Sequence, residues 1–122
     1  LGQQAQMPES YLPSEQWFDK AKASVARYTN QLHCAPIVSG DTFISKPETR
    51  QWIEANFPKA VAVEMEAAAI AQTCYLLGTP FLILRAVSDN AGEGDTISYD
   101  TFVTQAASLS AKMNIDFIEN LI

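Results

Sequence analysis

The residues of this sequence best suited to chemistry directly follow two apolar runs. Glu64 and Glu66 end the run that begins at Ala60, and Asp89 follows the run Phe81–Val87. In open α/β sheets, ligands bind in the crevice at the carboxyl ends of the strands, where these acids would lie. Carboxylates in such a place are costly unless they are paired or hydrogen-bonded. The pattern therefore favours catalysis or ligand binding at this edge.

Arg85 lies inside the second apolar run and needs an anion there. A buried guanidinium is tolerated only when it is paired, so we expect an ion pair in the core with one of the two glutamates. The other glutamate would then be left to accept hydrogen bonds from ligand hydroxyls. A sugar diol offers two such donors to one carboxylate. Asp89 is either a turn or helix-cap residue or a general acid whose proton affinity is raised by burial.

Phe43 and Ile44 follow the turn sequence that begins at Ser39. They are either two ordinary core residues after a turn, or an aromatic platform beside a backbone that reads the edge of a heterocycle. The residues alone leave both readings open.

Alternating helices and strands would position these residues. Helical spacing of apolar residues, with cap and stop signals, predicts four helices. The first covers 14–32, the second runs from a capping box at Ser45–Glu48 to about Phe57, and the third covers 66–77. The fourth begins at a Ser98 cap, and its apolar stripe consists of Phe102, Ala106, Leu109, Met113, Phe117 and Leu121. Apolar runs predict strands at 35–40, 61–65 and 81–87. The helix over 66–77 is apolar on nearly all sides and is expected to be buried, with a left-handed stop at Gly78.

Composition narrows the function classes. The chain has 122 residues, of which 48% are hydrophobic, and a net charge of −6. It has no basic stripe for nucleic acid and no apolar run as long as a membrane span. Cys34 and Cys74 are expected to be buried free thiols of a cytoplasmic protein. The one histidine with its neighbouring cysteine does not make a metal site, so no metal or cofactor is expected.

The segment Leu1–Pro13 is polar and contains two prolines. It does not have the pattern of the first strand of an α/β domain. We therefore expect residues 1–122 to be the C-terminal part of one longer domain, and the isolated chain to be incomplete.

Three motifs resemble those of 5′-methylthioadenosine/S-adenosylhomocysteine nucleosidases, which belong to the purine nucleoside phosphorylase superfamily. They are Val38-Ser-Gly-Asp-Thr-Phe-Ile44, Ala62-Val-Glu-Met-Glu-Ala-Ala-Ala-Ile70 and Leu84-Arg-Ala-Val-Ser-Asp-Asn-Ala91. The resemblance extends over the whole chain in order and spacing. It implies a three-layer α/β fold with a central mixed sheet flanked by helices. It also implies an enzyme of methionine salvage that releases adenine by hydrolysis of the N-glycosidic bond, without a cofactor, as a homodimer.

On the purine side, the resemblance implies that Asp89 protonates N7 of the leaving adenine. Ser88 would support the loop of Asp89, and Ala91 would line it. Phe43 would stack on the adenine, and the backbone of Ile44 would read its edge.

On the ribose side, the resemblance implies that Met65 lies under the sugar and that Glu66 binds the 2′- and 3′-hydroxyls. The substrate-binding set is completed by Val63, Glu64 and Arg85. Tyr99 stands near the 5′-substituent, where the family usually has Phe. Leu1 and Pro8 match a loop that reaches the partner subunit's 5′-alkylthio pocket.

The family's water-activating glutamate and its Gly-rich segment are not in these 122 residues. Phosphate ligands of the superfamily's phosphorylases also lie mainly in the part that precedes. The alternatives are therefore a purine nucleoside phosphorylase that uses phosphate and a non-catalytic α/β binding module.

Overall fold

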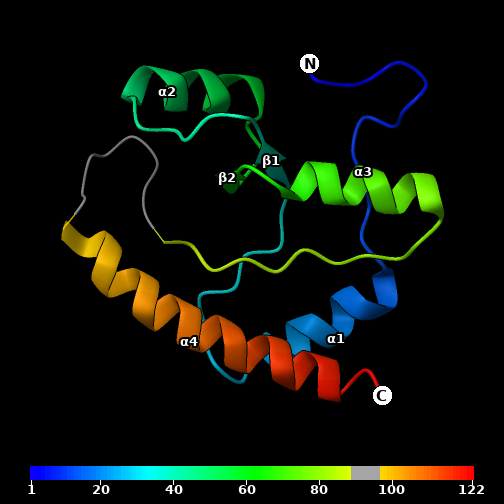
Figure 1. The fold of residues 1–122 in the computed structure, drawn as a ribbon, viewed down its shortest axis with the longest axis vertical. Coiled ribbons are helices and arrows are strands. Elements are labelled where there is room, and N and C mark those ends of the chain that lie inside the picture. Colours follow the sequence, from blue (N-terminus) through cyan, green and yellow to red (C-terminus); the bar gives the residue numbers. More distant parts are fainter. Residues whose placement is uncertain (89–96) are drawn as a thin grey trace.

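A computed structural model describes residues 1–88 and 97–122 (Figure 1). The elements are α1 (Glu15–Val25), β1 (Ile37–Ser39), α2 (Pro47–Asn56), β2 (Ala62–Glu64), α3 (Ala67–Leu77) and α4 (Ile97–Glu119). This alternation of helices and strands confirms the α/β class. Two predicted site residues, Asp89 and Ala91, lie outside the described residues.

Local signals explain most element ends. The Ser14 hydroxyl accepts a hydrogen bond from the Trp17 N–H at 3.4 Å and caps α1, as predicted. Gly78 ends α3 with φ of 65°, a left-handed conformation that suits a residue without Cβ.

Two predicted caps are wrong. The N-cap of α2 is Lys46 and not Ser45, and it makes no side-chain cap hydrogen bond. This start places Pro47 at the first helical position, where its missing N–H costs nothing. Ser98 does not cap α4 either, because that helix already begins at Ile97.

The two strands form a parallel pair with the register Ile37↔Ala62, Val38↔Val63 and Ser39↔Glu64. Backbone hydrogen bonds extend the pairing at both ends, from the Val61 N–H to Pro36 O and from the Gly40 N–H to Glu64 O, each 3.0 Å long. Because the strands are parallel and in register, both carboxyl ends lie at one edge of the sheet.

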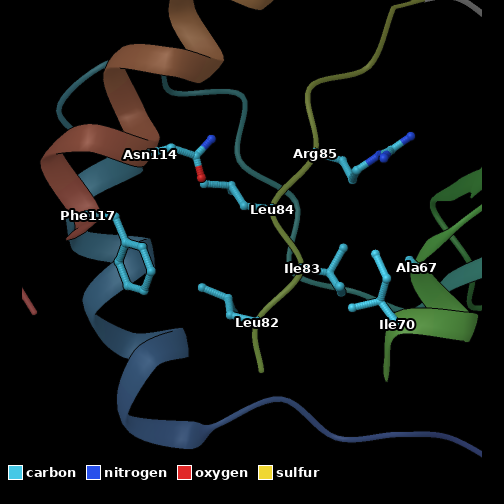
Figure 2. A pocket seen from close by; sticks show the side chains of 8 residues that line it. All are labelled: Ala67, Ile70, Leu82, Ile83, Leu84, Arg85, Asn114 and Phe117. Carbon is cyan, nitrogen blue, oxygen red and sulfur yellow. The ribbon is translucent and has the colours of Figure 1, made fainter. Parts of the chain in front are cut away.

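The predicted strand at 81–87 is not part of a sheet among the described residues, whose sheet consists of β1 and β2. Its side chains nevertheless alternate: Figure 2 shows Leu82 and Leu84 on the side of α4, and Ile83 and Arg85 on the side of α3. The segment thus has the two-sided apolar pattern of a central strand without a ladder partner, and a strand requires one.

The described core is small and lies mainly between α1 and α4. Its buried apolar side chains are Ala21, Val25, Ala67, Ala71, Met113 and Phe117. Arg27, in the turn that follows α1, forms an ion pair of 3.1 Å with Asp116 of α4. The predicted stripe of α4 is confirmed at Met113 and Phe117, which are buried.

The expectation of a fully buried α3 is wrong for this chain. Ala67 and Ala71 are buried, but Ile70 and Leu77 are 52% and 74% exposed. Cys34 is also exposed, although Cys74 is half-buried and both thiols are free. Among the described helices and strands, α3 packs chiefly against β1, and much of its remaining apolar surface is exposed.

Among the described helices, none has both the length and the apolar character needed to cross a bilayer. Among the side chains that the structure describes, no cluster of three or more His, Cys, Asp or Glu residues is placed to hold a metal ion.

Candidate functional site

The predicted site residues gather at the carboxyl edge of the β1–β2 pair. β1 ends at Ser39 and β2 ends at Glu64, directly opposite in register. The Phe43 segment follows β1, and Met65 and Glu66 connect β2 to α3. One sheet edge therefore carries the pair of acids, and the Phe43 segment leaves the same edge.

Glu64 is the buried member of the acid pair, with 6% of its side chain exposed. Its carboxylate accepts hydrogen bonds from the Glu66 N–H at 2.9 Å and from the Ala67 N–H at 2.8 Å. It also accepts a hydrogen bond from the Ser39 hydroxyl. Glu64 thus satisfies N–H groups at the start of α3, where the helix dipole favours a negative charge.

The surroundings of Glu64 keep it ionised. Burial, the largest single influence, raises the pKa of this carboxyl. The hydrogen bonds from Ser39, Glu66 and Ala67, together with the positive charge of Arg85, outweigh burial and lower the pKa below its ordinary value of 4.5. Glu64 is therefore an anion and only an acceptor at neutral pH.

Arg85 forms ion pairs with both glutamates. Its Nη1 lies 3.8 Å from Glu64 Oε2, and its Nη2 lies 3.7 Å from Glu66 Oε2. The expectation that it would pair with one glutamate only is wrong, because the two ends of the guanidinium fork reach both. The expected burial of this arginine in the core is also wrong, since 47% of the Arg85 side chain is exposed in this chain.

Glu66 is the exposed member of the acid pair. It is the N-cap residue of α3, with φ of −129° and ψ of −29°, so the chain has left the extended conformation of β2. Its own side chain makes no cap hydrogen bond, and 63% of it is exposed. The carboxylate of Glu66 is therefore open to a ligand, with Arg85 as its described cationic neighbour.

Two apolar residues at the same edge are also exposed. They are Phe43, which follows β1, and Met65, which lies between β2 and α3. More than a third of the surface of each is exposed to solvent. Ile44, which follows Phe43, and Val63, in β2, are both half-buried. The exposed thioether of Met65 thus belongs to the residue that precedes Glu66, and the exposed ring of Phe43 belongs to the segment that follows the neighbouring strand.

The cavity in Figure 2 is a different feature. It has a volume of about 230 Å³ and is lined by Ala67, Ile70, Leu82, Ile83, Leu84, Arg85, Asn114 and Phe117. Neither carboxylate of the acid pair lines it, and its walls are mostly aliphatic. Of the described residues predicted for the site, only Arg85 lines it, so the cavity is the space around residues 82–85.

The remaining predicted residues are more distant or not described. Ser88 is half-buried at the end of the described segment. Tyr99 belongs to the first turns of α4, and its side chain is outside the described part of the structure. Leu1 is 77% exposed, while Pro8 is half-buried. The N-terminal loop runs along α3, where Gln72 donates a hydrogen bond of 2.7 Å to Gln4.

Ser39 is the residue of this site that sequence reasoning missed. Its hydroxyl donates to Glu64 Oε1 and accepts a hydrogen bond of 2.9 Å from the Ala68 N–H. The signal was its place as the last residue of a strand whose parallel neighbour ends in a carboxylate. In the sequence, the following Gly-Asp instead made it look like a turn residue.

Comparison with known proteins agrees with the motifs. Residues 2–120 match the profile of the phosphorylase superfamily. A 5′-methylthioadenosine/S-adenosylhomocysteine nucleosidase from Staphylococcus carnosus (strain TM300) is 40% identical over 121 residues, which is 99% of this chain and 53% of that protein. The chain spans about half the length of the curated relatives it matches.

Solved structures show the same likeness. The nucleosidase from Neisseria meningitidis in complex with methylthio-immucillin-A has a TM-score of 0.86 and 42% identity, over 98% of this chain and 52% of that one. The futalosine hydrolase of Helicobacter pylori strain 26695 has a TM-score of 0.81 and 33% identity, over 93% of this chain and 50% of that one. The predicted nucleoside phosphorylase-like fold is thereby confirmed.

Proposed function

Because this chain belongs to the phosphorylase superfamily, we propose that its complete protein hydrolyses the N-glycosidic bond of 5′-methylthioadenosine and S-adenosylhomocysteine and releases adenine. The observation that carries the proposal is the division of the acid pair. Glu64 is buried and capped by protein donors, whereas Glu66 is open to a ligand at the sheet edge. Relatives with these substrates in their names support the choice of nucleoside.

Bond cleavage builds positive charge on the ribose, and the ribose side is assigned to the exposed acid. Glu66 accepts hydrogen bonds from the 2′- and 3′-hydroxyls and stabilises the developing oxocarbenium ion. Met65 lies under the sugar, and Val63 contributes to the wall behind it. Arg85 stays between the two carboxylates, and its exposed guanidinium is available to the ribose oxygens.

Cleavage also builds negative charge on the purine, which needs a proton donor. We assign this role to Asp89, which follows the 81–88 segment in the chain and protonates N7. Ser88 and Ala91 support and line its loop. Phe43 stacks on the adenine and the backbone of Ile44 reads its edge, a proposal supported by the exposure of the Phe43 ring.

The 5′-substituent and the subunit partner belong to the same proposal. Tyr99 borders the 5′-substituent, and Leu1 and Pro8 reach the corresponding pocket of a second copy in a homodimer. The exposure of Leu1 is consistent with a residue that contacts a partner. We place the protein in the cytoplasm, in the salvage of methionine.

We further propose that the rest of the same domain covers the exposed apolar faces of this chain. Besides Ile70 and Leu77 of α3, the outer face of α4 exposes Ile115 and Ile118 at helical spacing. The segment 81–88 has the side-chain pattern of a central strand and lacks a ladder partner among the described residues. Strands of the remaining half would supply that partner.

The test is an assay of the full-length protein with methylthioadenosine, S-adenosylhomocysteine and futalosine, with and without phosphate, followed by separation of the free purine base and the sugar products. We expect adenine and a free thio-ribose without phosphate. Formation of a sugar 1-phosphate that depends on phosphate would show a phosphorylase instead. Turnover of futalosine alone would favour the activity in the name of the Helicobacter pylori relative. Nucleoside binding without any product would show a non-catalytic module.

A further inference from the structure

We propose that Ser39 and Glu64 are positioning residues, which together cap the start of α3 and thereby fix the carboxylate of Glu66 where a ribose diol can reach it. The inference rests on the proposed function, and it gives Glu64 a role other than the substrate contact expected from sequence. It also assigns a role to Ser39, which does not touch the substrate in this scheme.

The start of α3 is satisfied from outside the helix. The Glu66 and Ala67 N–H groups donate to Glu64 at 2.9 and 2.8 Å, and the Ala68 N–H donates to the Ser39 hydroxyl at 2.9 Å. A Ser, Thr, Asp or Asn at the N-cap accepts such a bond through its own side chain. Here the N-cap residue is Glu66, whose side chain is released from capping and remains available for a ligand.

Glu64 has little capacity left for a substrate. Oε1 accepts from the Ser39 hydroxyl and from the Ala67 N–H at 3.0 Å, and Oε2 accepts from the Glu66 and Ala67 N–H groups and faces Arg85. Its side chain is also almost inaccessible, whereas that of Glu66 is mostly exposed. The two carboxylates therefore divide the work, with Glu64 holding the backbone and Glu66 facing solvent.

Ser39 completes the arrangement because its hydroxyl both donates and accepts. It donates to Glu64 on β2 and accepts from the backbone of α3 while it is itself part of β1. One side chain thus connects three elements at the point from which Glu66 projects. Alanine at this position would remove both bonds and leave the Glu64 carboxylate and the Ala68 N–H each short of a partner.

The experiment compares Ser39→Ala, Ser39→Thr and Ser14→Ala in the full-length protein. Ser14→Ala is the matched control, because it removes the same kind of helix cap from α1, which does not carry Glu66. Thermal unfolding, kcat and KM for methylthioadenosine, and the dissociation constant of adenine are measured for each variant. Adenine lacks the ribose, so its binding reports on the purine side only.

We expect Ser39→Ala to lower kcat/KM about tenfold or more, since misplacement of a catalytic group by about 1 Å can cost about a hundredfold. Adenine affinity should stay within twofold (about 0.4 kcal/mol), and Ser39→Thr, which keeps the hydroxyl, should recover most of the loss. Ser14→Ala should lose stability without a comparable loss of kcat/KM.

Equal effects of Ser39→Ala and Ser14→Ala on kcat/KM at comparable stability would overturn the inference. So would a Ser39→Ala protein that folds with unchanged kinetics. If Ser39→Ala fails to fold, Ser39→Thr decides: a folded Thr variant with wild-type kinetics supports the role of the hydroxyl, and a folded one with the alanine-like loss expected above overturns it. An inactive wild-type protein would instead refute the proposed function itself.

Discussion

Replacement of Glu64 by glutamine tests whether this buried carboxylate is held as an anion. Glu64→Gln keeps the size of the side chain but removes its charge, and its amide NH₂ would face backbone N–H groups that need acceptors. Hydrogen bonds to a charged group exceed those to a neutral one by about 1 kcal/mol each. For the three donors, from Ser39, Glu66 and Ala67, this amounts to about 3 kcal/mol. Since such terms do not add fully, we expect a loss of about 2 kcal/mol at neutral pH.

The pH dependence of this loss follows from the direction of the pKa shift. The pKa of Glu64 in the folded state lies below its ordinary value of 4.5. As pH falls, the unfolded chain therefore takes up the proton first, and the native state loses stability relative to it. The contribution is fully present above about pH 4.5 and disappears as pH falls through the folded pKa. Wild-type and Glu64→Gln proteins should then converge in stability.

The assay is urea unfolding of both full-length proteins at steps from neutral to acidic pH, with the difference in free energy of unfolding as the readout. Glu54→Gln is a suitable control, because that glutamate forms an exposed ion pair with Arg50 within α2, and such pairs contribute little. A difference between wild type and Glu64→Gln that is absent at neutral pH, or that stays constant down to acidic pH, would refute the reasoning.

Three further predictions concern catalysis and completeness. Glu66→Gln should fold normally but lower kcat about a hundredfold, or about 3 kcal/mol, because a charge-assisted contact to the ribose is lost in the transition state; wild-type turnover in steady-state kinetics would contradict this. Asp89→Asn should bind substrate almost normally and lose about a thousandfold or more in turnover, since amides cannot donate the proton as an acid does; near-normal turnover would mean that the acid lies elsewhere. A recombinant chain of residues 1–122 alone should unfold without cooperativity and be inactive, because its apolar faces lack cover; a sharp calorimetric transition together with adenine release would count against it.

The parts of the fold that the sequence predicts well are those controlled by neighbouring residues. The Ser14 cap and the left-handed Gly78 each depend on the conformation of a few adjacent residues, and both are confirmed. β1 and β2 also lie within their predicted ranges, since short β-branched runs between turn signals favour strands. Two element ends were predicted wrongly: α2 begins at Pro47, because proline is favoured at the first helical position, and α1 ends at Val25, although its apolar spacing predicted a helix as far as residue 32.

Burial and strand pairing could not be predicted for this chain in the same way. An apolar pattern records that a residue is covered in the final fold, but not which residues cover it. The segment 81–88 keeps the alternation of a two-sided strand and α3 keeps its apolar surface, although the described chain provides neither a ladder partner for the first nor cover for most of the second. Both differences have the same physical cause, because they depend on contacts distant in sequence.

The candidate site shows the same limit at the level of single side chains. Charge balance predicts that Arg85 meets a glutamate, but the bridging of both depends on the turn of the backbone at Glu66, where the helix begins. Ser39 reaches partners 25 and 29 residues away in sequence, so no local pattern contains its role. In the sequence, Glu64 and Glu66 are two equivalent acids. They become different in the structure because α3 begins directly after Glu66: N–H groups at the helix start donate to the first carboxylate, and the second projects from the N-cap position. A functional carboxylate at a helix start can thus stay open to a ligand when a neighbouring acid satisfies the helix in its place.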